Sequence, residues 1–188
     1  MKILALTAAF VAASPVATAE IVDSVRLGVM DHNIKVIDGK NADKEDGVNI
    51  NGEIRFSQFD FLGETWSPYP FVMASVNTAG ETSYGAVGLE WDFEFLDGWH
   101  FEPGVGYTIH NGELEGEGAT AAERAEFGSQ HVLLGSRDLF RTSFILTRDI
   151  NEDWAVQLVF EHLSHGQILG NGRNQGLDEF GFRIARNF

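Results

Sequence analysis

Residues 84–95 read YGAVGLEWDFEF, and apolar side chains alternate with polar or small ones along the whole stretch. Side chains on a β-strand point to opposite faces in turn, so one face of this segment is apolar and the other polar. The apolar face carries Val87, Leu89, Trp91, Phe93 and Phe95. The opposite face carries Ala86, Gly88, Glu90, Asp92 and Glu94. The segment therefore predicts an amphipathic strand of about ten residues, the pattern of a membrane β-barrel strand.

The same alternation recurs along the chain and predicts eight strands. They lie at residues 21–34, 48–58, 69–77, 84–95, 99–110, 139–150, 154–164 and 177–188. An even number of antiparallel strands closes into a barrel with both termini on one side. Short turns at 96–98 and 151–153 then lie at one end, and the long connections 35–47, 111–138 and 165–176 lie at the other. Short turns at one end and long loops at the other are typical of outer-membrane barrels.

Alternation by itself does not distinguish a membrane barrel from a soluble β-sandwich, in which the charged face would meet water. Strand length and aromatic residues at the strand ends favour the barrel. The aromatic residues in question are Trp99, Tyr107, Trp154 and the terminal Phe188. We therefore predict an all-β fold, an eight-stranded antiparallel transmembrane β-barrel of the outer membrane.

The N-terminal residues also indicate a protein that is exported towards the outer membrane. Lys2 precedes an apolar run, and Ala17-Thr18-Ala19 follows as a small-x-small cleavage site. These features predict a secretory signal peptide at residues 1–19. The apolar run is too short to span a bilayer of about 30 Å. Residues 20–188 are then expected to form a single β-barrel domain.

Composition narrows the function classes. The 188 residues carry a net charge of −15, which argues against nucleic acid as a partner. The chain has no cysteine, so it can form no disulfide and perform no thiol chemistry. Beyond the leader there is no apolar run of the length that a transmembrane helix needs.

Polar side chains interrupt the apolar face of strand 154–164 near its end. His162 and Ser164 share that face with Trp154, Val156, Leu158 and Phe160. A base and a nucleophile on the lipid side of a barrel are unexpected there unless the substrate is itself a lipid. A serine hydroxyl becomes a useful nucleophile when an adjacent imidazole accepts its proton.

The last predicted strand offers a carboxylate for the same site. Asp178 falls on the aromatic face of strand 177–188, and Glu179 falls on the inward face. Neighbouring antiparallel strands therefore bring Asp178 to His162, where a carboxylate would orient the imidazole. Glu179 is the alternative third residue. The backbone N–H groups of His165 and Gly166 and the side-chain amide of Asn174 are candidate donors to an oxyanion.

These residues also resemble a known family. Glu161-His162-Leu163-Ser164, followed by Asn174-Gln175-Gly176-Leu177-Asp178 and a final strand ending in Phe188, is similar to the PagL family of outer-membrane lipid A 3-O-deacylases. The resemblance implies an eight-stranded barrel that hydrolyses the 3-position hydroxyacyl ester of lipid A. It also implies Ser164 as nucleophile, His162 as base and Asn174 as an oxyanion contributor. The chain departs from the family in having Asp178 where the family usually has Glu, and His165 where Asn is frequent.

The resulting expectation is a serine esterase of the outer leaflet with lipid A or lipopolysaccharide as substrate, surrounded by outer-membrane lipids. The mechanism needs no cofactor, and no metal site is expected. Glu161, which points inward, is expected to join lumen charges such as Arg55, Arg141 or Arg183. The oligomeric state stays open, a homodimer included. Two alternatives also stay open: a non-catalytic small barrel, and a periplasmic barrel that binds lipid in its interior.

Overall fold

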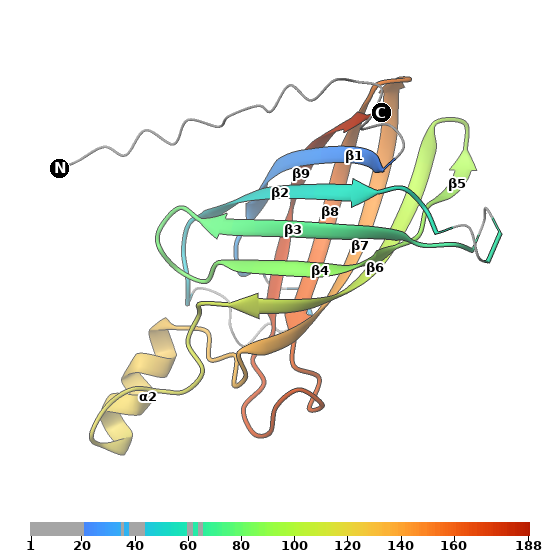
Figure 1. The fold of residues 1–188 in the computed structure, drawn as a ribbon. Helices are drawn as coiled ribbons and strands as arrows, with labels where there is room; N and C mark the ends of the chain where they lie inside the picture. Colours follow the sequence, from blue (N-terminus) through green and yellow to red (C-terminus); the bar gives the residue numbers. More distant parts are fainter. Residues whose placement is uncertain (1–20, 35, 38–43, 60–61, 64–65) are drawn as a thin grey trace.

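A computed structural model describes residues 21–34, 36–37, 44–59, 62–63 and 66–188. The predicted signal peptide at 1–19 lies outside the described residues. Strand segments dominate the part that is described (Figure 1). Their bounds are β1 Val22–Asp31, β2 Val48–Phe56, β3 Tyr69–Asn77, β4 Tyr84–Glu90, β5 Phe93–Leu96, β6 Trp99–His110, β7 Asp138–Asn151, β8 Trp154–Ser164 and β9 Leu177–Asn187.

The strands form one closed antiparallel sheet. Successive strands pair from β1 to β4, β1 pairs with β9, and β9 leads back through β8 and β7 to β6. The pairing of β4 with β6 closes the ring. Beyond the end of β4, β5 continues the same position in the ring and also pairs with β6. Because β4 and β5 together occupy one position, the described residues make an eight-stranded barrel. This confirms the predicted fold class.

The predicted continuous strand at 84–95 is wrong, because it is interrupted at Trp91 and Asp92. The Trp91 N–H donates to the carbonyl oxygen of Pro103 at 3.0 Å on the facing strand. Pro103 has no N–H to donate to Trp91, so one backbone hydrogen bond of the β4–β6 ladder is missing at this point. The remaining predicted strands are present with ends displaced by a few residues, most of all in β1, which ends at Asp31.

The two faces of the wall have opposite character. Phe182 is 64% exposed on the outside, whereas its neighbour Arg183 points into the lumen and is 3% exposed. The same alternation of exposed apolar and buried polar residues runs along β1 and β2. A soluble sandwich would place the charges in water, so this arrangement has the inverted polarity of a membrane barrel.

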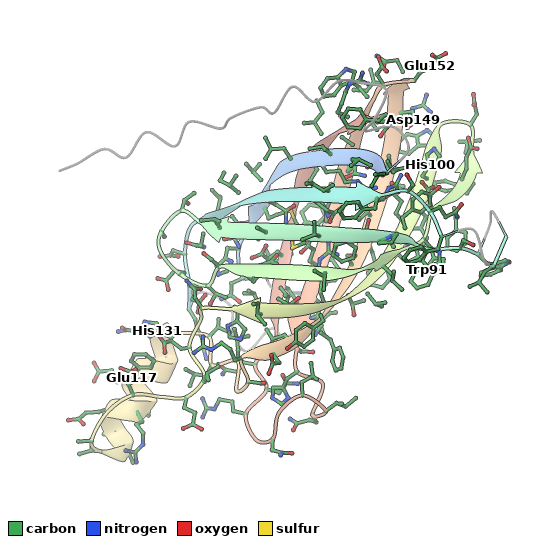
Figure 2. The ribbon with its side chains drawn as sticks, viewed as in Figure 1. Trp91, His100, Glu117, His131, Asp149 and Glu152 are labelled. Atoms are coloured by element: carbon green, nitrogen blue, oxygen red, sulfur yellow. The ribbon has the colours of Figure 1, made fainter. Side chains whose placement is uncertain are left out.

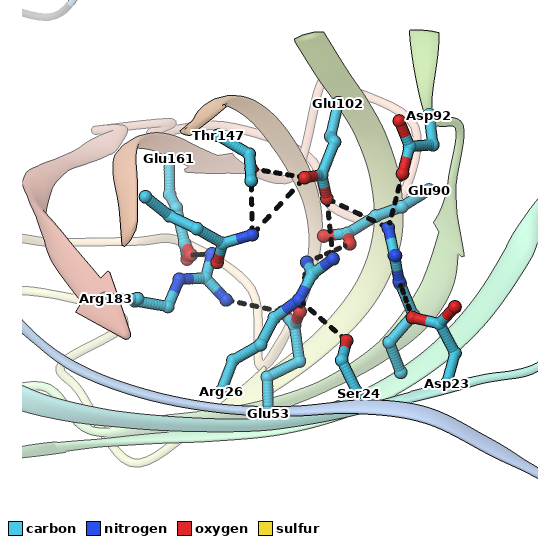
Figure 3. Close-up of polar contacts among 12 residues, drawn as sticks. Asp23, Ser24, Arg26, Glu53, Glu90, Asp92, Glu102, Thr147, Glu161 and Arg183 are labelled. Carbon is cyan, nitrogen blue, oxygen red and sulfur yellow. Dashed lines mark hydrogen bonds and ion pairs between the residues drawn. The ribbon is translucent and has the colours of Figure 1, made fainter. Parts of the chain in front are cut away.

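Ion pairs fill the lumen, as Figure 3 shows. The Arg26 guanidinium contacts Glu53 at 2.9 Å, Glu90 at 2.7 Å and Glu102 at 2.6 Å. Glu161 joins this network as predicted, pairing with Arg141 at 2.7 Å and with Arg183 at 3.2 Å. Buried charges are tolerated only when each has partners, and here cations and carboxylates interleave.

A helix, α2 (Ala121–Gln130), lies within the connection that was predicted to be a loop at 111–138. Thr120 and Glu123 form a capping box, in which the Thr120 hydroxyl accepts the Glu123 N–H and the Glu123 carboxylate accepts the Thr120 N–H. The Thr-x-x-Glu spacing was the available sequence signal for this helix start. No helix in the described part of the chain has both the length and the apolar character needed to cross a bilayer.

The barrel has two distinct ends. Figure 2 shows Trp91, His100, Asp149 and Glu152 at the end opposite α2, and Glu117 and His131 beside the helix. The connection between β8 and β9, residues 165–176, leaves the barrel at the α2 end (Figure 1). The candidate site lies at this end, where β8 stops and β9 starts.

Candidate functional site

His162 and Ser164 lie on the outer face of β8, as the two-residue period predicts. Their neighbours Glu161 and Leu163 point inward and are buried. The His162 side chain is 19% exposed, and Ser164 is partly exposed at the last position of the strand. Both polar groups therefore interrupt the otherwise apolar outside of the barrel close to its rim.

Asp178 of β9 is the acidic residue that reaches the imidazole. It is the register partner of His162 across the β8–β9 ladder, and its Oδ1 lies 2.6 Å from His162 Nδ1. The adjacent Glu179 points into the lumen, where it contacts His32 at 2.8 Å and Asn49 at 2.6 Å. The structure thus brings Asp178 and His162 together and keeps Glu179 on the other side of the wall.

The segment after β1 covers Asp178. The Ile37 N–H donates to the Asp178 carboxylate, and the Ile34 N–H donates to its backbone carbonyl at 2.9 Å. Asp178 is 2% exposed as a result. A carboxylate at Nδ1 favours the imidazole tautomer with the proton on Nδ1, which leaves Nε2 as the acceptor.

Ser164 lies one strand repeat, about 6–7 Å along the backbone, from His162 on the same face. Across the β7–β8 ladder its register partner is Phe140, which is itself exposed on the outside. Within the described residues, no hydrogen bond joins the Ser164 hydroxyl to His162. Hydrogen bonds of this kind are often long in substrate-free enzymes and shorten when substrate binds.

His165 is buried and organises the β8–β9 connection. Its Nδ1 accepts the Gln167 N–H at 3.1 Å, so its Nε2–H donates to the Arg173 carbonyl at 2.9 Å. Its backbone N–H donates to Asn174 Oδ1 at 3.1 Å. The predicted His165 oxyanion donor is therefore already used within the loop. The bond orients Asn174, whose amide NH₂ group stays a candidate donor together with the N–H of the exposed Gly166.

Gly176 determines how closely the loop approaches the imidazole. A Cβ at this position would lie 2.6 Å from His162 Cε1, closer than real Cβ contacts allow. The approach of Gly176 to His162 was not predicted from the sequence. The Asn174-Gln175-Gly176 spacing was the signal that could have indicated it.

A second cluster lies on the lumen side of the same rim. His32 bridges Glu179 and Glu45 through its two ring nitrogens, at 2.8 Å and 2.9 Å. Burial alone would lower the pKa of His32, but the hydrogen bonds to the two carboxylates outweigh it and raise the pKa to about 9. The protonated imidazole therefore places one positive charge between these two acids at neutral pH. No group of three or more His, Asp or Glu side chains in the described residues is arranged to hold a metal ion.

Two solved outer-membrane proteins share this fold. The outer membrane enzyme PagL aligns with a TM-score of 0.55 at 15% sequence identity, over 89% of this chain and 99% of PagL. The Yersinia pestis outer membrane protein Ail aligns with a TM-score of 0.50 at 10% identity, over 90% of this chain and 100% of Ail. Neither family models nor curated proteins give a match. Identities this low show the fold alone, so the chain has the architecture of small outer-membrane barrels.

Proposed function

We propose that this protein is a serine esterase of the outer membrane that removes the 3-position hydroxyacyl chain of lipid A. The observation that carries the proposal is the His162–Asp178 pair at 2.6 Å on the outer face of the barrel, with Ser164 next along that face. Polar groups of this kind are costly against lipid unless they serve a function.

The proposed reaction follows from these three groups. Ser164 Oγ attacks the ester carbonyl carbon as His162 Nε2 accepts the hydroxyl proton, and Asp178 stabilises the imidazolium through Nδ1–H. The Asn174 amide and the Gly166 N–H donate to the oxyanion. Collapse of the intermediate breaks the bond to the sugar 3-oxygen, which takes the proton from His162. Water then attacks the acyl-serine by the same route and releases a 3-hydroxy fatty acid.

The surroundings of the site suit a substrate that stays in the bilayer. Phe160 lies between Phe144 of β7 and Phe180 of β9 in the strand register, and the rings of Phe144 and Phe160 are stacked 6.5 Å apart. An apolar wall below the polar trio would contact acyl chains, and the ester at the headgroup level would meet Ser164. Such a substrate reaches the wall by lateral diffusion, so the site needs no deep cavity.

The likeness to PagL supports the reaction class from two directions. The fold matches that of an outer-membrane enzyme, and the His-x-Ser and Asn-x-Gly segments of the PagL family pattern occur in this chain at His162, Ser164 and Asn174. Asp178 in place of Glu shortens the acidic side chain by one methylene. Its 2.6 Å contact with His162 supports the same role for the shorter residue.

The substitution Ser164→Ala tests the proposal. We expect the parent protein, folded in mixed micelles with lipid A, to lower the lipid A mass by one hydroxyacyl group, and the variant to lose at least ~10³-fold of that rate. Mass spectrometry of the lipid and of the free fatty acid measures both. Ser129→Ala is the matched control, because that hydroxyl lies on α2 and donates to the Glu126 carbonyl.

A non-catalytic barrel is the second candidate, and one observation favours it: the Ser164 hydroxyl makes no hydrogen bond to His162 within the described chain. The same experiment separates the two functions. Absence of fatty-acid release by the parent would leave the non-catalytic candidate, and equal release by the parent and by Ser164→Ala would overturn the proposed serine mechanism.

A further inference from the structure

A cleft of about 400 Å³ lies between α2 and the β8–β9 connection. It is lined by residues of the connections and of α2, and its lining does not include His162, Ser164 or Asp178. Its lining includes Leu114, Glu115, Arg124, Ala125, Leu133 and Arg173. Apolar side chains thus form part of the walls, and two guanidinium groups with one carboxylate supply the charge.

The two arginines differ from those in the lumen. Arg26, Arg141 and Arg183 are each ion-paired with glutamates. Within the described residues, Arg124 and Arg173 form no ion pair with a carboxylate, although the chain as a whole carries a net charge of −15. Arg124 donates to the Gly118 carbonyl at 2.9 Å, and the Arg173 guanidinium makes no hydrogen bond to the described chain. Both cations are therefore available to an anion in the cleft.

We propose that this cleft binds a phosphate group of the phosphorylated sugar headgroup of the lipid substrate. The inference rests on the proposed function for the identity of that lipid. Guanidinium groups bind phosphate oxygens with paired N–H donors, and a sugar ring can pack against apolar walls such as Leu114 and Leu133. Among the lining residues, Arg124 and Arg173 outnumber the single acid, Glu115.

The loop connects this cleft to the reacting groups. Arg173 directly precedes Asn174, and its carbonyl accepts the Nε2–H of His165, the residue after Ser164. Asn174 in turn accepts the His165 N–H. A phosphate held by Arg173 would therefore fix the segment that presents Asn174, and would set which ester of the lipid meets Ser164.

The test measures binding without catalysis. Full-length Ser164→Ala protein is immobilised and exposed to phosphatidylcholine nanodiscs that contain either bis-phosphorylated lipid A or the same lipid A with both phosphates removed. We expect Arg173→Gln and Arg124→Gln each to weaken binding of the phosphorylated lipid about tenfold, the usual effect of losing a charge-assisted hydrogen bond. Binding of the dephosphorylated lipid should not change. Glu115→Gln, which removes the only carboxylate among the named lining residues, should strengthen binding of the phosphorylated lipid.

Arg148→Gln is the control, because that arginine lies at the opposite end of the barrel and donates to the Asp97 carbonyl. Equal binding of the phosphorylated lipid by parent and cleft variants, or equal losses with both lipids, would overturn the proposal. Inorganic phosphate in excess should reduce the difference between parent and variants, because it competes for the same guanidinium groups. A difference that excess phosphate leaves unchanged would also overturn the proposal. Failure of the proposed function is read separately, as absence of fatty-acid release by the parent.

Discussion

Asp178 and Glu179 are neighbours in the sequence, yet they lie on opposite sides of the barrel wall. Asp178 contacts His162 on the outside, and Glu179 contacts His32 in the lumen. The two-residue period of a β-strand is sufficient to separate them, because any residue that follows Asp178 must point the other way. In the proposed mechanism, Asp178 therefore orients His162, whereas Glu179 contributes to the interior.

The substitution Asp178→Asn tests that role. Asparagine keeps the size of the side chain but removes the charge that stabilises the imidazolium and fixes its tautomer, so we expect the hydrolysis rate to fall by roughly 10²–10⁴-fold. Asp178→Glu should keep most of the activity, since it retains a carboxylate at this position. Initial rates of fatty-acid release from lipid A measure both. Equal activity of the Asn variant and the parent would contradict the role.

At the scale of elements, Glu45 makes hydrogen bonds that join three of the connections between strands at the rim of the barrel. Its carboxylate accepts the Val132 N–H at 3.0 Å and the Thr82 N–H at 3.2 Å, and it contacts His32 at 2.9 Å. These partners come from separate connections between strands. Through His32 the cluster also reaches Glu179, which is adjacent to Asp178. The loops that surround the candidate site are therefore held by one charged centre.

The raised pKa of His32 gives this centre a pH dependence. The protonated form is favoured in the folded protein, so its contribution is fully present below the unfolded pKa of about 6.5 and is lost as pH rises towards about 9. We expect the midpoint temperature of thermal unfolding in detergent to decrease as the pH is raised from 6.5 to 9. The corresponding loss of stability is on the order of 3 kcal/mol at most.

His32→Gln is the matched variant for this prediction. Glutamine can still hydrogen-bond to both carboxylates but does not titrate, so the midpoint of the variant should be lower at pH 6.5 and nearly flat up to pH 9. Thermal unfolding followed by circular dichroism measures both proteins. A parent and variant that lose stability in parallel over this range would show that another group is responsible.

Sequence patterns predicted the strands well because each lies half against the lumen and half outside, which produces strict alternation. The interruption at Trp91 was missed because it depends on Pro103 in the facing strand. The contact of His162 with Asp178 could be predicted, because alternation places both residues on the same face and their strands follow one another along the chain. The Glu45 centre and the cleft beside α2 could not be predicted, since they depend on how long loops pack on one another.

At the scale of the whole molecule, the lumen is held together by charge. Arg26 extends across the interior to Glu53 of β2, Glu90 of β4 and Glu102 of β6, so one cation links strands around much of the ring. Many of the large apolar side chains face outward, and the ion network lies in the interior beside a buried apolar cluster that includes Phe71, Leu139 and Leu163. Its stability therefore depends on the balance between buried arginines and glutamates.

Removal of Arg26 tests this dependence. Arg26→Met removes the charge and keeps an unbranched side chain, so Glu53, Glu90 and Glu102 each lose one of their cationic partners. We therefore expect a loss of about 3–5 kcal/mol in unfolding free energy. Urea unfolding in lipid vesicles measures it. Arg186→Met is the control, since its pair with Asp153 is largely exposed and such pairs contribute about 0–1 kcal/mol. Adding Glu90→Gln to Arg26→Met should recover part of the loss, because it removes one of the uncompensated charges. Equal small effects of the Arg26 and Arg186 variants would show that apolar contacts, and not the buried ion network, hold the barrel closed.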